Sequence, residues 1–200
     1  MPNANASFGF KPINRDGSPY TGATLRCVML ATTGTAIFVG DPVQLDGNAD
    51  ATTGIASVKM GASSADVYGV VTAIEANPDN LTQQYRLAST KRFCQVAPAT
   101  GNYFLVQSDD DTTALLVSDV GMNADFISTD SGSTAYGISK VELDSSTATT
   151  TTSLDCQVVG FSQEPGNDLS AGVTAGSGGT NKNVIVRFNL PQGRYTRTGV

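Results

Sequence analysis

The stretch from Leu25 to Leu45, LRCVMLATTGTAIFVGDPVQL, contains two runs of apolar and β-branched residues separated by the turn-forming segment TTGT. Runs of this length with a connection of hairpin length predict two β-strands, Leu25–Ala31 and Ala36–Leu45. We expect the second run to break at Gly40-Asp41-Pro42, because proline cannot donate a hydrogen bond to a central strand pair. This stretch therefore indicates β structure, and the same pattern recurs along the chain.

Turn residues separate the later apolar runs, which follow one another at intervals of about 8 to 15 residues. The strongest turn signals are Asp46-Gly47-Asn48 and Asn77-Pro78-Asp79-Asn80. Such spacing predicts an all-β fold, an antiparallel barrel or sandwich with long surface loops. The other expected strands are Gly54–Lys59, Val67–Glu75, Tyr85–Ala88, Arg92–Val96, Tyr103–Gln107, Phe126–Ile127, Ile138–Leu143, Leu154–Phe161 and Val184–Leu190. Ala114–Val120 fits either a strand or a helical turn.

The expected organisation is an extended N-terminal arm (1–24), a single β domain (25–190) and a basic C-terminal tail (191–200). A small second lobe after about residue 120 is the alternative. Ser145–Ser153 is rich in threonine and fits an exposed loop or the start of a strand. Ala171–Asn183 is rich in glycine and predicts a surface loop. Strands of similar character flank both segments, so neither is expected to be a domain linker.

The arm has no helical or strand periodicity, and prolines and glycines interrupt it throughout. It nevertheless carries the apolar residues Phe8, Phe10, Ile13 and Tyr20. Solvated tails are poor in aromatic residues, because an exposed aromatic ring gains nothing from water. We therefore expect the arm to dock, and the residues leave two alternatives open: docking along its own domain or docking on a partner.

The side chains needed for common catalytic chemistry are missing, since the chain has no histidine. This excludes Ser-His-Asp and Cys-His nucleophiles and most zinc sites. A Ser-Lys dyad or a carboxylate pair is formally possible, but none of the three glutamates lies in a context that suggests a raised pKa, so we expect no enzyme, no metal and no cofactor. Asp109-Asp110-Asp111 lacks the alternate spacing and the turn glycine of a calcium loop. Cys27, Cys94 and Cys156 lie inside apolar runs, and an odd number of widely spaced cysteines predicts buried free thiols.

Charge is distributed unevenly along the chain. Of the total of −6, the residues after Asp168 contribute +4, so the preceding part carries −10. An acidic body argues against a broad nucleic-acid interface. The basic tail fits a contact with an acidic protein surface or with an edge of a neighbouring subunit, and it fits a solvated terminus equally well. No apolar run approaches the roughly 18 residues of a membrane span, and the N-terminus lacks a signal-peptide layout, so we expect a protein made in the cytoplasm with no membrane partner.

Several segments taken together carry a resemblance to a known family. These are SFGFKPINRDGSPYTGAT (7–24), TAIFVGDPVQLDGNAD (35–50), YGVVTAIEANPDNL (68–81), GMNADFI (121–127) and KVELDSST (140–147). In this combination the chain resembles the auxiliary head proteins of tailed bacteriophages, which are encoded near major capsid proteins. The likeness extends from Phe8 to about Leu190, and it is a whole-chain pattern rather than a catalytic motif.

The resemblance implies a non-catalytic decoration or cement protein on the exterior of the virion capsid. Such a protein bridges neighbouring capsomers, typically as a homotrimer, with the major capsid protein as its partner. The alternative is a virion-associated adhesin or tail β module that binds host surface glycans. The residues that we expect to contact a partner are Phe8, Phe10, Pro12 and Tyr20 in the arm, and Arg194, Tyr195 and Arg197 in the tail.

Overall fold

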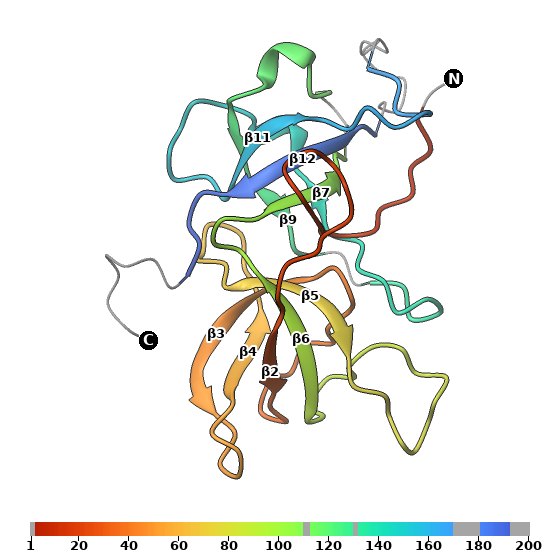
Figure 1. The fold of residues 1–200 in the computed structure, drawn as a ribbon, viewed down its shortest axis with the longest axis vertical. Coiled ribbons are helices and arrows are strands. Elements are labelled where there is room, and N and C mark those ends of the chain that lie inside the picture. Colours follow the sequence, from red (N-terminus) through yellow and green to blue (C-terminus); the bar gives the residue numbers. More distant parts are fainter. Residues whose placement is uncertain (1–2, 110–112, 130–131, 170–180, 193–200) are drawn as a thin grey trace.

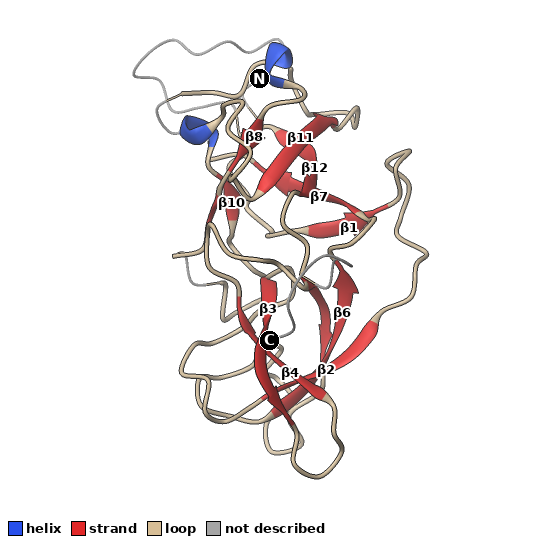
Figure 2. Ribbon diagram, turned by 90° about the vertical axis from the view of Figure 1, so that its left-hand side faces the viewer, coloured by secondary structure: helices blue, strands red, loops and turns tan. Residues whose placement is uncertain are grey.

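The computed structural model describes residues 3–109, 113–129, 132–169 and 181–192, and it confirms an all-β protein. A closed barrel and a five-stranded sheet are stacked along the long axis, as Figures 1 and 2 both show. Helical structure within the described residues is limited to two short 3-10 turns, η1 (Val117–Asp119) and η2 (Ser145–Thr147). No helix in this part of the chain has the length and apolar character to cross a membrane.

The barrel closes in the order β2-β4-β3-β5-β6. Neighbouring strands pair in antiparallel fashion except β2 and β4, which are parallel and meet at Val28 and Ser57. Closure leaves no exposed sheet edge, which is how small barrels avoid edge-to-edge association. The barrel strands are β2 (Leu25–Met29), β3 (Pro42–Ala49), β4 (Ala56–Met60), β5 (Gly69–Ile74) and β6 (Arg92–Pro98).

The second unit is an antiparallel sheet in the order β1-β7-β12-β11-β8, accompanied by the two-stranded pair β9-β10. Its strands come from distant parts of the sequence, and β1 belongs to the N-terminal arm. The strands are β1 (Lys11–Ile13), β7 (Tyr103–Gln107), β8 (Asn123–Ala124), β9 (Phe126–Ile127), β10 (Glu142–Leu143), β11 (Cys156–Phe161) and β12 (Asn183–Phe188).

Two hydrophobic cores hold these units. Small aliphatic side chains and two thiols fill the barrel, among them Val43, Val58 and Cys94. The larger core lies under the sheet and also includes Val70 and Ala97, which belong to barrel strands β5 and β6. Because barrel residues contribute to the core of the sheet, the two units pack on one another rather than standing apart.

The buried side chain of Arg86 holds together loops of the barrel. It is fully buried, and its guanidinium donates hydrogen bonds to the backbone carbonyls of Leu30 (2.6 Å), Thr33 (2.8 Å), Thr35 and Thr90 (2.8 Å). A buried cation normally needs compensation for its lost hydration. Here four carbonyl dipoles supply it and fix the β2–β3 loop against the β5–β6 loop.

Three expectations from the sequence differ from the structure. Asp46-Gly47-Asn48 is not a turn but part of β3, because Gly47 adopts φ +73° and allows a bulge in the pairing with β4; the chain turns after Asp50 instead. The predicted strand Tyr85–Ala88 is reduced to a single bridge between Arg86 and Ile37. Ile138–Leu143 forms only the two-residue strand β10.

The expected strand Ala36–Leu45 is interrupted as predicted at Gly40-Asp41-Pro42: residues 36–40 form only the isolated bridges of Ile37 and Val39, and β3 begins at Pro42. The remaining strands agree with expectation to within a few residues. Ala114–Val120 contains the 3-10 turn η1. The structure places a sheet after residue 120, but this sheet also includes β1 and β7, so it does not follow that boundary. Most of the glycine-rich segment Ala171–Asn183 and residues 193–200 of the tail lie outside the described residues.

Candidate functional site

The N-terminal arm lies along its own molecule. β1 pairs with β7 in the register Lys11 to Leu105. Nearer the N-terminus, the Ala6 amide donates to Oε1 of Gln107 (2.8 Å), and Nε2 of Gln107 donates to the Ala4 carbonyl (3.0 Å). The Asp168 amide donates to Oδ1 of Asn3 at 2.7 Å. Of the two alternatives left open by the sequence, the structure therefore shows docking along the arm's own domain.

Phe10 is a core residue. Only 1% of its surface is exposed, and its ring lies 5.0 Å from that of Phe188, 5.7 Å from Phe126 and 6.4 Å from Phe104, measured between ring centroids. Such edge-to-face and tilted clusters add stability beyond the burial of area. The expectation that Phe10 contacts a partner is not supported by this geometry, because the same chain already covers the ring.

Gly9, between Phe8 and Phe10, lies very close to two other parts of the chain. Gly9 has φ +71°, and a Cβ atom there would lie 2.4 Å from Cβ of Ser139 and 2.6 Å from the Gly40 carbonyl oxygen. The Phe10 amide donates to that same Gly40 carbonyl at 2.8 Å. Only glycine fits this position without strain. The chain is thereby fixed with Phe10 in the core and Phe8 half-buried at the surface.

Phe8 lines an open groove of about 550 Å³ between the arm and the loop that precedes β10. We call this the Phe8 groove; its lining residues are Asn5, Ala6, Ser7, Phe8, Ser133, Tyr136, Ile138 and Lys140. Tyr136 is 71% exposed and Ile138 is 41% exposed. Two backbone hydrogen bonds of 2.8 Å, Ser133 N–H to Ile138 O and Gly137 N–H to Ser133 O, shape the loop that presents them.

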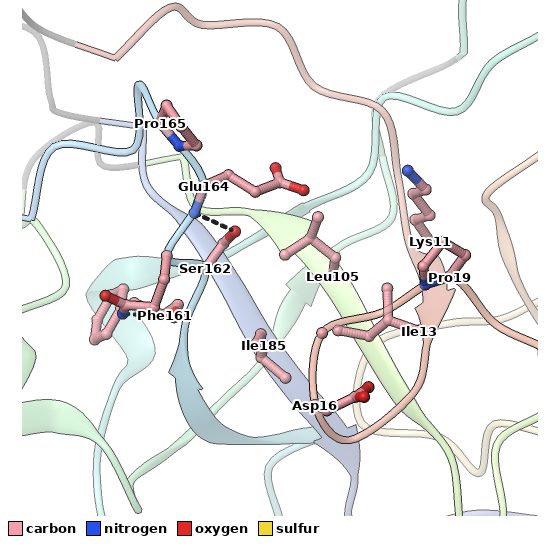
Figure 3. Close-up of a pocket in the computed structure, with 12 residues that line it drawn as sticks. Lys11, Ile13, Asp16, Pro19, Leu105, Phe161, Ser162, Glu164, Pro165 and Ile185 are labelled. Carbon is pink, nitrogen blue, oxygen red and sulfur yellow. Dashed lines mark hydrogen bonds between the residues drawn. The ribbon is translucent and has the colours of Figure 1, made fainter.

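A second groove, of about 420 Å³, lies on the outer face of the five-stranded sheet and is shown in Figure 3. We call it the sheet groove. Leu105 of β7 and Ile185 of β12 lie across its centre, with Ile13 and Pro19 of the arm on one side and Phe161 and Pro165 on the other.

Charged side chains stand around the sheet groove: Lys11, Asp16 and Glu164. The pKa of Asp16 is lowered chiefly because the Ser18 hydroxyl (2.7 Å) and amide (3.0 Å) donate hydrogen bonds to its carboxylate. This apolar centre with charges of both signs at its edge is suited to binding a protein segment rather than to catalysis.

The other residues expected to contact a partner are distributed as follows. Pro12 is half-buried within β1, opposite Phe104. Tyr20 is half-buried against the sheet core, and its hydroxyl donates to the Ala23 carbonyl at 2.9 Å. Arg194, Tyr195 and Arg197 lie outside the described residues. The structure therefore places Phe8 in the lining of the Phe8 groove. Pro12 and Tyr20 are half-buried where the arm packs on the sheet.

Sequence reasoning missed Tyr136 and Ile138, as well as Leu105 and Ile185 of the sheet groove. Tyr136 and Ile138 are two large apolar residues in the otherwise small and polar segment STAYGISK (133–140). This contrast could have indicated an exposed contact site. Leu105 and Ile185 belong to predicted strands, but which face of a strand stays open depends on how the sheet packs. The sequence alone does not contain that information.

Within the described residues, the cysteines and acidic residues do not form a nucleophilic or metal-binding site. The three cysteines are buried free thiols, as expected. Burial raises the pKa of Cys27 to about 11 and that of Cys94 to about 12, which keeps both protonated. No group of three His, Cys, Asp or Glu residues in the described ranges could hold a metal ion. Asp109 accepts hydrogen bonds from the Ser145 amide (2.9 Å) and hydroxyl (2.7 Å), while Asp110 and Asp111 lie outside these ranges.

Comparison of the chain with protein-family models, with characterised proteins and with solved structures finds no match.

Proposed function

We propose that this chain is a structural virion protein that decorates and stabilises a bacteriophage capsid by bridging capsomers. Its partner is the major capsid protein, it acts as a homotrimer on the capsid exterior, and it performs no catalysis. The proposal combines the family resemblance of the sequence with one structural observation. The arm is fixed to the sheet, and it forms one side of both the Phe8 groove and the sheet groove.

This position of the arm supports a bridging function for a physical reason. A capsid segment that enters either groove contacts the arm and a second part of the molecule at once, so binding needs no rearrangement of the core. Aromatic side chains such as Phe8 and Tyr136 bury roughly 150–250 Å² each when covered. At ~25 cal/mol per Å² this corresponds to several kcal/mol before the costs of association, and many copies act together on one shell.

The direct test is binding to expanded bacteriophage heads that lack this chain. We expect Phe8→Ser combined with Tyr136→Ser to lower the affinity at least about tenfold, which is the loss of one or two central apolar contacts. Val117→Ser is the matched control, since Val117 is 57% exposed on η1 and lines neither groove. Co-sedimentation across a concentration series measures the affinity.

Equal binding by the double variant and the wild type would refute the role of the Phe8 groove. Failure of the wild type to bind expanded heads would refute decoration altogether. The assembly state has its own measurement. Analytical ultracentrifugation is expected to give the mass of three chains, and a monomer at every concentration that saturates the heads would contradict a preformed trimer.

A second function, glycan binding as a virion adhesin, has one observation in its favour. Tyr136 presents an exposed aromatic ring beside amide and hydroxyl groups of Asn5, Ser7 and Ser133. Sugar-binding sites commonly pair a flat ring with such polar groups. Selective signals on a glycan array that Tyr136→Ser abolishes, together with no affinity for expanded heads, would establish this function in place of decoration.

A further inference from the structure

Two buried aspartates lie where the barrel meets the sheet, a boundary that we call the seam. Asp41 comes from the barrel, immediately before β3, and Asp155 comes from the sheet unit, immediately before β11. They are 2% and 1% exposed, respectively. Each makes hydrogen bonds to the opposite unit, so both carboxyl groups belong to the contact between the units and not to either core alone.

Asp155 is held by the barrel loop that follows β4. Its Oδ2 accepts a hydrogen bond from the Ser63 hydroxyl (3.0 Å), and its Oδ1 accepts one from the Ser64 amide (2.8 Å). Ser64 adopts φ +63°, an unfavourable conformation for a residue other than glycine, which the contact with Asp155 maintains. On the sheet side, the Asn189 amide donates to the Asp155 carbonyl at 2.8 Å.

A second carboxylate faces Asp155 from the chain segment before β9. Oδ1 of Asp125 accepts a hydrogen bond from the Asp155 amide at 3.1 Å. Burial and the charge of Asp125 together raise the pKa of Asp155 to about 7. The thiol of Cys156 is affected by both carboxylates, and its pKa lies well above the usual value mainly because it is fully buried. Asp66 in the barrel loop and Asp144 beside Asp125 are the next charged residues on these segments.

Asp41 makes the corresponding contact from the barrel side. Its Oδ2 accepts a hydrogen bond from the Phe38 amide at 2.8 Å, and its carboxyl group is hydrogen-bonded to the side chain of Ser139, next to Lys140 in the sheet unit. Burial raises the pKa of Asp41 to about 6 despite these hydrogen bonds, because desolvation penalises the charged form more than the donors favour it.

We infer that the seam is a pH-sensitive joint, tight when Asp41 and Asp155 are protonated and loosened when both are ionised. Burial of both carboxyl groups at the seam supports this coupling, because an ionised carboxylate gains hydration when the surrounding contacts open. The inference is independent of the proposed function, since it concerns the chain before it meets any partner.

The direction of the pH effect follows from proton binding. Between pH 4 and pH 7 the folded state keeps protons on these carboxyl groups that the unfolded or opened state has released. Stability therefore falls as pH rises through this interval and levels off above about pH 7. The contribution of the two groups is fully present below their unfolded pKa of 3.8.

Amide hydrogen exchange on the full chain tests the inference. The Val67 amide, which donates across the seam to the Leu190 carbonyl at 3.0 Å, reports on opening, and the Val28 amide in β2 is the internal control. After correction for the intrinsic rate, we expect Val67 to lose more than about tenfold in protection between pH 5 and pH 8, because Asp41 alone, with a pKa about one unit above pH 5, contributes about a factor of ten. Val28 should change less.

Asp155→Asn removes the charge while keeping the shape of the side chain, and it should reduce the loss of protection at Val67 to about tenfold or less, the part that Asp41 contributes. Asp79→Asn, in an exposed turn, is the matched control and should behave as the wild type. A carboxyl-carbon NMR titration of the wild type gives a second readout that needs no variant. Midpoints below pH 5 for both Asp41 and Asp155, or Val67 protection that does not depend on pH, would overturn the inference.

Discussion

The barrel and the sheet reach similar β architecture by different routes. All five barrel strands lie between residues 25 and 98, and small aliphatic side chains fill their core. The sheet gathers strands from residue 11 to residue 188, and its core contains five phenylalanines, of which Phe10, Phe104, Phe126 and Phe188 form one cluster of rings. The barrel is therefore built from neighbouring parts of the chain, whereas the sheet depends on distant segments that include the N-terminal arm.

Two residues of the arm, Phe8 and Phe10, therefore have different roles. Phe10 completes the core of the sheet, and Phe8 lines the groove beside it. A deletion of the whole arm would remove both, so loss of partner binding after such a deletion would not identify a binding residue. Single substitutions separate the two tasks, and they also show how far the barrel is independent of the sheet.

The largest effect is expected for Phe10→Ala. Removal of a fully buried phenylalanine ring typically costs about 3–5 kcal/mol of unfolding free energy. Urea unfolding followed by hydrogen exchange should show early loss of protection in β7 and β12, with β2 and β6 still protected. A cost below about 1 kcal/mol, or simultaneous loss in all four strands, would contradict the division between barrel and sheet.

Arg86→Met is expected to destabilise the barrel, where Arg86 holds two loops together. The substitution keeps most of the apolar volume but leaves four backbone carbonyls without their donor, so we expect a loss of about 2–4 kcal/mol. Exchange should increase first in the loops around Leu30 and Thr90. Arg15→Met, at an exposed position of the arm, is the control and should stay within about 0.5 kcal/mol of the wild type.

The smallest effect on stability is expected for Phe8→Ala. Phe8 is half-buried and not part of either core, so the urea midpoint should correspond to a loss of less than about 1 kcal/mol. Affinity for expanded heads should nevertheless fall. A loss of stability as large as that of Phe10→Ala would show that the two positions share one structural task.

The sequence predicts strands in both units, and the predicted strands Tyr103–Gln107 and Phe126–Ile127 coincide with β7 and β9. Runs such as Arg92–Val96 become strands because alternate side chains face one closed core, and Pro42 marks the break before β3. β1 could not be predicted, because Lys11-Pro12-Ile13 has no strand pattern and pairs only because β7 offers a partner. The turn expected at Gly47 was wrong because a bulge and a turn use the same glycine conformation.

The candidate site was predicted only in part. An arm rich in aromatic residues indicates docking, but the residues do not tell which ring enters the core. The tight contact of Gly9 with Ser139 makes that choice, and these two residues lie 130 positions apart in the sequence. Exposed Tyr136 and the position of Leu105 and Ile185 in the lining of the sheet groove likewise follow from packing that local patterns do not encode.

The most direct test of capsid binding through the grooves beside the arm is a hydrogen-exchange footprint of the wild-type chain on expanded heads. We predict new protection in residues 3–8 and 132–140 around the Phe8 groove or in the strands of the sheet groove, with the β3–β4 hairpin unchanged. Protection confined to the β3–β4 hairpin, at the end of the barrel away from the sheet (Figure 1), would contradict it.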